Sequence, residues 1–230
     1  TWESLEGIVK HNGVISNNIS PYINEYNKKH NLSLNLNPLL ESQISAIADD
    51  VAYNNHDIED SIRAGLINIS SLNEIDYFNN IIRNVCDRFP KIEDHLLIYQ
   101  ILRMSITLMI NDIIEHSSKI ILESNIKTTY DIMNHNAFLI SMSDKMKKDC
   151  LEIRTFLYDN VYNHPKLKEQ RSKVEIIISK IFEYYEKNFN KLPSDWLVKN
   201  DYDEKQRIIC DYISGMTDRY ASKLYKNLYE

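Results

Sequence analysis

The stretch NPLLESQISAIADDVAYNNHDIEDSIRAG, residues 37–65, decides the fold class, because it reads as one long amphipathic helix. Asn37 can cap such a helix, Pro38 suits its first turn, and Gly65 is a suitable C-terminal stop. Between them, apolar side chains recur at helical spacing and form one stripe: Leu40, Ile44, Ile47 and Val51. The sequence therefore predicts a helix over residues 37–65 whose stripe faces a core.

The rest of the chain repeats this pattern. The segment SSLNEIDYFNNIIRNVCDRF has a serine cap, apolar residues at helical spacing, and Pro90 directly after it. Only four glycines and five prolines interrupt the 230 residues, and no stretch alternates apolar and polar residues as a strand would. We therefore predict an all-α fold, with further helices over residues 70–89, 92–123, 143–161, 167–189 and 204–228.

Composition and charge exclude several classes of partner. The net charge of −6 gives no electrostatic basis for broad binding to nucleic acid or to an anionic membrane. The longest apolar run, SITLMINDII, is broken by Asn111 and Asp112, so we predict no membrane-spanning segment. The three cysteines lie far apart with no metal-binding spacing: Cys86, Cys150 and Cys210. This pattern predicts reduced thiols in a cytoplasmic protein.

The segment ADDVAYNNHDIED, residues 48–60, carries the polar residues that chemistry could use. Asp49, Tyr53 and Asp57 are spaced by four, so on a helix they lie along one face, with His56 close to the same line. The helix rise separates Asp49 from Asp57 by ~12 Å, too far for both to bind one ion. Such a face can supply one metal ligand and contact an extended ligand such as a nucleoside triphosphate. The alternative is an ordinary solvated acidic face.

Three long segments, in order and with consistent spacing, resemble one known family. TWESLEGIVKHNG (1–13), LESQISAIADDVAYNNHDIEDSIRAG (40–65) and DYISGMTDRYA (211–221) are similar to the deoxyguanosine triphosphate triphosphohydrolase-like (dGTPase-like) branch of the HD-domain phosphohydrolases. FLYDNVYNHP and LPSDW, between the second and third segments, agree as well. The resemblance covers essentially the whole chain.

The resemblance implies a function as well as a fold. Members of the family are all-helical oligomers that hydrolyse a deoxynucleoside triphosphate (dNTP) to the deoxynucleoside and tripolyphosphate. They use a divalent metal, which we expect to be Mn²⁺ or Mg²⁺ here. Residues 1–66 would be the C-terminal part of the HD-type catalytic core, and residues 67–230 a helical region that packs on it. The expected partners are a dNTP and further copies of the chain.

Individual residues carry over where the motifs match. The resemblance implies that Asp49 binds the metal, and that Tyr53 and Asp57 contact the deoxyribose and phosphate region. Lys10 and His11, in the KHNG motif, would lie near the substrate phosphates. In GMTDRYA, two weaker candidates would line the pocket or an oligomer interface: Asp218 and Arg219. The alternative for these two is a simple charge pair on the last helix.

The chain also departs from the family pattern. The family's first metal-binding histidine and its His-Asp pair precede the TWESLEG segment and have no counterpart here, so three of four expected metal ligands are missing and no catalytic residue is identified. We therefore expect a C-terminal portion that is incomplete at its N-terminus, inactive alone, oligomeric or poorly soluble, and completed by a separate N-terminal fragment. The alternatives are a non-catalytic nucleotide-binding or oligomerisation module, and a helical structural protein.

Overall fold

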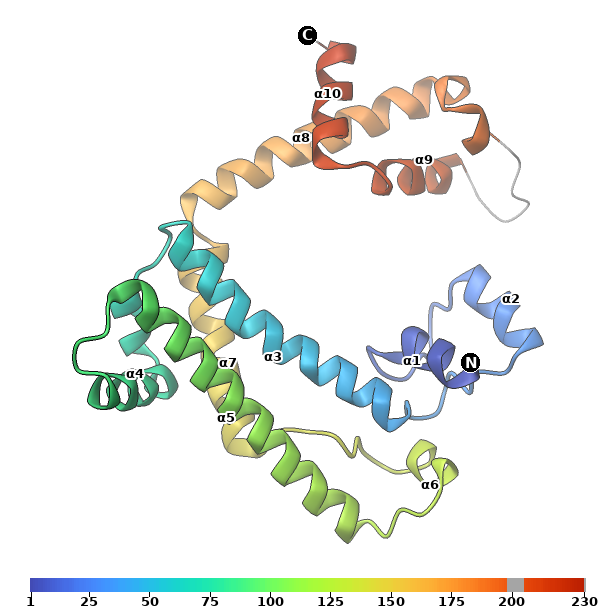
Figure 1. The fold of residues 1–230 in the computed structure, drawn as a ribbon. Helices are drawn as coiled ribbons and strands as arrows, with labels where there is room; N and C mark the ends of the chain where they lie inside the picture. The colour runs from blue at the N-terminus through green and yellow to red at the C-terminus, as the bar shows by residue number, and fades with distance from the viewer. Residues whose placement is uncertain (198–204, 230) are drawn as a thin grey trace. The chain divides into compact units, whose positions relative to one another are not determined.

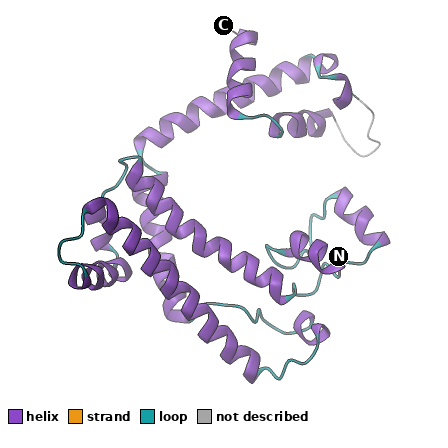
Figure 2. Cartoon of the chain, viewed as in Figure 1, coloured by secondary structure: helices purple, strands orange, loops and turns teal. Residues whose placement is uncertain are grey.

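The computed structural model describes residues 1–197 and 205–229, and every regular element within these ranges is a helix (Figures 1 and 2). The predicted all-α fold class is confirmed. The chain divides into two compact units, residues 1–162 and residues 163–230. The predicted boundary after residue 66 lies inside the first unit. The predicted boundary separates part of a catalytic core from a region that packs on it, and a division into compact units does not test that distinction. The boundary therefore stays a prediction.

The first unit is built around one long helix, α3 (Leu40–Arg63). Helices α1, α5 and α7 contact α3, while α4 packs against α5 and η1. The other elements of this unit are α1 (Trp2–Lys10), α2 (Pro21–Lys29), η1 (Ile69–Glu74), α4 (Asp76–Arg88), α5 (Asp94–Glu123), α6 (Thr129–Met133), α7 (Asp144–Leu157) and the π-helical turn η2 (Tyr158–Tyr162).

Helix α3 begins at Leu40, two residues after the first position that a cap at Asn37 would give. The residue before its first turn is Leu39, in extended conformation, so the predicted cap at Asn37 is wrong. The Asn37 amide instead donates a hydrogen bond to the carbonyl of His135, 2.5 Å away, which ties the chain before α3 to the segment after α6. The predicted stop is confirmed, since Gly65 follows the last turn with a φ of +65°, a conformation that suits glycine.

The core of the first unit covers only part of α3. Val51 and Ile58 are buried, together with apolar side chains from the neighbouring helices that include Phe78, Ile101, Met109 and Ile153. Ile44, which the sequence places in the same core-facing stripe, is 50% exposed. The expectation that the stripe faces a core is therefore wrong for Ile44, whose side chain instead lines an open groove between α3 and α5.

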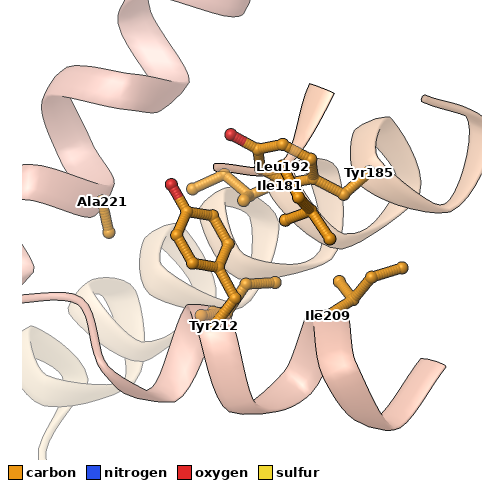
Figure 3. Packing of buried hydrophobic residues seen from close by; sticks show 7 residues of the cluster. Ile181, Tyr185, Leu192, Ile209, Tyr212 and Ala221 are labelled. Carbon is orange, nitrogen blue, oxygen red and sulfur yellow. The ribbon is translucent and has the colours of Figure 1, made fainter. Parts of the chain in front are cut away.

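The second unit contains α8 (Pro165–Lys187), η3 (Phe189–Lys191), η4 (Ser194–Trp196), α9 (Lys205–Ser214) and α10 (Asp218–Tyr229). Its core is shown in Figure 3 and consists of Ile181, Tyr185, Leu192, Ile209, Tyr212, Ile213 and Ala221. The segment 204–228, predicted as one helix, is two helices separated at Gly215, and its first residue lies outside the described part of the chain.

Helix α5 is the most apolar element. By length and composition alone it could cross a bilayer, yet only 22% of its most apolar 18-residue window is buried in this chain. Asp112, in the middle of α5, accepts hydrogen bonds from the backbone N–H and the hydroxyl of Ser143, at 2.8 and 2.6 Å. These bonds attach the start of α7 to α5, and the Ser143 hydroxyl itself caps α7 by accepting a hydrogen bond from the N–H of Met146, 3.2 Å away. A charged, hydrogen-bonded group at this position favours packing in protein over insertion in lipid.

Buried tyrosines make the stability of the chain sensitive to alkali. Tyr77 donates a hydrogen bond to the carbonyl of Ser105, 2.9 Å away, and burial raises its pKa to about 12. An unfolded tyrosine titrates near pH 10. Because the folded pKa is the higher one, the stabilisation is complete below pH 10 and is lost as the pH rises toward 12.

We therefore expect the free energy of unfolding of wild type to fall by about 1.4 kcal/mol more than that of Tyr77→Phe between pH 8 and pH 11. Denaturant titrations at the two pH values measure this difference. Tyr130→Phe is the control, since Tyr130 is 68% exposed, and it should follow wild type. An equal loss in wild type and Tyr77→Phe would show that the Tyr77 hydroxyl does not retain its proton.

Candidate functional site

The candidate site lies along one face of α3. The helix is continuous from Leu40 to Arg63, so Asp49, Tyr53 and Asp57 follow one another at one-turn intervals as predicted. Asp49 is exposed, Tyr53 is 69% exposed, and Asp57 is half-buried. The line of side chains therefore runs from an open end at Asp49 to a more enclosed end at Asp57.

Tyr162 closes the enclosed end. Its hydroxyl donates a hydrogen bond to the Asp57 carboxylate, although 105 residues separate the two in the chain. Burial, then the hydrogen bond to Asp57 and its negative charge, raise the pKa of Tyr162 to about 12. Tyr162 therefore remains a proton donor at neutral pH and holds the Asp57 side chain in one orientation. Sequence spacing gave no sign of this pair, because only the π-helical turn η2 brings Tyr162 to α3.

A pocket lined by both charged and apolar side chains adjoins this face of α3 on one side, and we call it the polar pocket after its charged residues. Its volume is about 590 Å³, and it lies between the end of α1, α3, α7 and residues 138–142. His11, a predicted substrate-binding residue, lines it together with Asp50, Lys147 and Arg154. Arg154 and Asp50 form an ion pair at 3.4 Å, with both side chains more than half exposed. The pocket thus places two permanent cationic groups beside the line of candidate residues. Neither cation was selected by the sequence analysis.

An apolar groove of about 600 Å³ adjoins the same line on the other side, between α3 and α5. Ala48, Ala52 and His56 of α3 belong to its wall. Because each helical residue turns by ~100°, Asp49 and Tyr53 come next around the helix after these residues. The candidate line therefore lies between a polar pocket and an apolar groove.

Lys10 has a different place from the one predicted. Its side chain is fully buried, and its ammonium is 2.8 Å from the Glu6 carboxylate. The ammonium also donates hydrogen bonds of 3.0–3.2 Å to three backbone carbonyls, those of Ser33, Leu36 and Asn37. These contacts occupy the Lys10 ammonium inside the protein. Lys10 therefore holds the loop before α3 in this structure and is not positioned to neutralise a phosphate.

The two weaker candidates lie in the second unit. Asp218 is the first residue of α10, where a carboxylate interacts favourably with the helix dipole, and Arg219 follows it. Both line a shallow hollow with Ser222, Lys223 and Lys226. The helix-start position explains Asp218 without a ligand, so the structural alternative accounts for it as well as a pocket role does.

A divalent metal fits these residues only in part. Within residues 1–197 and 205–229, no three His, Cys, Asp or Glu side chains come close enough together to hold a metal ion. Asp49 is one exposed carboxylate, and a carboxylate is a suitable ligand for Mn²⁺ or Mg²⁺. The described residues alone therefore do not form a metal site.

Known proteins are similar to this chain over nearly its whole length. Residues 140–227 match the phosphohydrolase-associated domain. The chain is 38% identical over 99% of its length to proteins from Rickettsia rickettsii and Rickettsia felis, and 36% identical to one from Rickettsia bellii, each named deoxyguanosinetriphosphate triphosphohydrolase-like protein. It spans 60% of the length of each of these relatives. The resemblance inferred from the sequence motifs is thereby confirmed.

The Glu6–Lys10 pair gives a test of whether Lys10 has a structural role. Lys10→Met should lower the free energy of unfolding by about 3–5 kcal/mol, because it leaves the Glu6 carboxylate buried without its countercharge. Lys119→Met removes a lysine that is 72% exposed and 3.9 Å from Glu123, and should cost less than about 1 kcal/mol.

Urea unfolding followed by circular dichroism measures both changes. The double variant Glu6→Gln with Lys10→Met should recover part of the loss, since neither charge is then left unpaired. Unfolding of Lys10→Met at the wild-type midpoint would contradict a buried pair and would return Lys10 to the candidates for phosphate binding.

Proposed function

We propose that this chain, a homologue of the deoxyguanosinetriphosphate triphosphohydrolase-like proteins, supplies one side of the active site of a cytoplasmic dNTP triphosphohydrolase. The reaction would release a deoxynucleoside and tripolyphosphate. The observation that carries the proposal is the Asp49–Tyr53–Asp57 line on α3, with Asp57 held by Tyr162 and with Lys147 and Arg154 in the polar pocket beside it. The similarity to proteins named deoxyguanosinetriphosphate triphosphohydrolase-like supports the reaction class, and the geometry of α3 supports the roles proposed below.

Asp49 would serve as one ligand of a divalent metal. The other ligands would come from residues other than 1–197 and 205–229, which the structure describes. The metal would supply a Lewis acid and an activated water at the substrate phosphate. Asp49 suits this part because its carboxylate is exposed on α3, next to both the pocket and the groove. The position also leaves room for other ligands to approach from the open side.

Tyr53, Asp57 and Tyr162 would position the sugar. The ~12 Å between Asp49 and Asp57 along the helix matches a ligand that extends from its phosphates to its deoxyribose. Tyr162 occupies one side of the Asp57 carboxylate, which leaves further lone pairs to accept a hydrogen bond from a sugar hydroxyl. These side chains would orient the substrate rather than exchange protons with it.

Arg154, Lys147 and His11 would meet the negative charge of the phosphates. Arg154 and Lys147 are fixed cations in the polar pocket, and His11 lies at its α1 end. An arginine can donate two parallel hydrogen bonds to a phosphate, which suits it to this task. The ion pair of Arg154 with Asp50 is surface-exposed and therefore weak, so a triphosphate could replace Asp50 as its partner.

The alternative is a non-catalytic function, because the residues that the structure describes include no complete metal site. Under this alternative, the chain binds a nucleotide or promotes oligomer formation without catalysis. Both functions use the same face of α3, so the measurement that separates them is product formation.

Product analysis with each dNTP and Mn²⁺ tests the proposed activity. We expect no deoxynucleoside or tripolyphosphate from this chain alone. We expect both products from a chimera in which the chain replaces the matched part of the R. rickettsii relative. Asp49→Asn in the chimera should reduce the rate at least ~100-fold, because an amide is a poor substitute for a metal-binding carboxylate.

Asp60→Asn is the matched control, since Asp60 is another exposed aspartate of α3 and lies about three turns beyond Asp49. It should leave the rate within about twofold. A chimera that binds nucleotide and forms no product, while the intact relative does, would support the non-catalytic alternative.

The Tyr162–Asp57 contact predicts a defect in positioning. Tyr162→Phe in the chimera should lower kcat/KM by about tenfold, the effect of one lost hydrogen bond to a charged group, while leaving the metal requirement unchanged. Asp57→Asn should lower it at least as much. Steady-state kinetics with varied dNTP and varied Mn²⁺ separate these effects. An unchanged kcat/KM in both variants would exclude Asp57 from substrate positioning.

A further inference from the structure

The groove between α3 and α5 is a large apolar surface that the residues of the first unit, 1–162, leave uncovered. Isoleucines from both helices form most of its walls, and three of them are about half exposed: Ile44 at 50%, Ile110 at 44% and Ile114 at 57%. Folded proteins usually cover contiguous apolar surface of this kind, because its contact with water is unfavourable. The groove is thus a candidate docking surface.

The isoleucines of α5 share one face of that helix. Ile106, Ile110, Ile113 and Ile114 recur at intervals of three and four residues, which is the period of an amphipathic helix packed against a partner. The opposite wall, from α3, is apolar over the same length. A second amphipathic helix laid along these two rows would bury its own apolar face in the groove.

The edge of the groove limits what can cover it. His56 of α3 lies at this edge, and Asp49 follows next around the helix. Any segment in the groove therefore comes beside the candidate metal ligand. A second copy of this chain, with a net charge of −6, would bring its own acidic residues toward this carboxylate. The groove thus favours an occupant of a different sequence.

The relatives are longer than this chain, and the additional polypeptide is long enough to include a helix that could cover the groove. This chain matches 60% of the R. rickettsii relative, so 40% of that protein has no counterpart among these residues. We propose that the groove between α3 and α5 is the docking surface for the polypeptide that corresponds to this unmatched 40%, whether it is joined to this chain or is a separate one. The inference rests on the proposed function in one respect: the docked polypeptide is the source of the other metal ligands.

Amide hydrogen exchange tests the inference without relying on activity. Exchange of residues 106–121 is compared between this chain and the chimera that carries the unmatched region of the R. rickettsii relative. Docking should slow exchange of this segment at least ~10-fold in the chimera, because covered helix backbone opens less often. Exchange of residues 205–229 in the second unit is followed as the internal reference.

Charged substitutions show whether the groove itself is responsible. Ile110→Glu combined with Ile114→Glu should remove at least ~10-fold of the protection in the chimera, since burying two carboxylates in an apolar groove is unfavourable. Both residues are about half exposed in the chain alone, so the same pair should leave its fold intact by circular dichroism. Leu122→Glu is the matched control, because Leu122 is on α5, is 82% exposed and is not part of the groove.

Four other results of the exchange experiment would overturn the inference. Equal exchange in the chain and the chimera would show that the unmatched region does not cover the groove, and protection that survives the double substitution would place docking elsewhere. Protection in the isolated chain that rises with its concentration would identify a second copy as the occupant. Protection conferred only by phosphatidylcholine vesicles would identify a membrane.

The result also separates the inference from the proposed function. Groove-dependent protection in a chimera that forms no product supports docking and counts against the triphosphohydrolase. Product formation in a chimera whose groove stays unprotected supports the enzyme and rejects the groove as the docking surface.

Discussion

The helical period of α3 is the constraint on which the rest of the first unit depends. One helix must pack against α1, α5 and α7 while presenting Asp49, Tyr53 and Asp57 to the outside. A period of ~3.6 residues achieves this by giving each task its own side of the helix. Val51 and Ile58 point into the core, the isoleucines near the start of α3 border the groove, and the candidate residues lie between the groove and the polar pocket.

The buried pair of Glu6 and Lys10 fixes where α3 begins. Glu6 accepts a hydrogen bond from the backbone N–H of Leu39, 3.3 Å away, while Lys10 binds the carbonyls of the preceding loop. Together they attach α1 to the first turn of α3, and the hydroxyl of Ser42 adds a 3.3 Å bond to the carbonyl of Gly7. Lys10, whose charge would suit phosphate binding, thus has a structural role. The cations beside the candidate line, Lys147 and Arg154, belong to α7.

The sequence predicted the fold class and the local geometry of the site, because both follow from spacing within one helix. The line of Asp49, Tyr53 and Asp57 is of this kind. Burial and long-range contacts were not predictable in the same way. The residues around Lys10 in the sequence do not indicate whether its side chain is buried or exposed. The hydrogen bond between Tyr162 and Asp57 forms only when η2 folds against α3. Ile44 fits a core stripe by its period, yet burial also requires a neighbouring element, which the period cannot supply.

Binding of Mn²⁺, followed by electron paramagnetic resonance, tests most directly whether this chain supplies one part of a shared metal site. We expect weak binding by the chain alone, and one tightly bound ion per molecule of the chimera that joins the chain to the unmatched region of the R. rickettsii relative. Asp49→Asn should remove this tight binding, whereas Asp60→Asn should retain it. If the chimera that carries Asp49→Asn bound Mn²⁺ as tightly as the unmodified chimera, Asp49 would not be a metal ligand and α3 would have no part in the metal site.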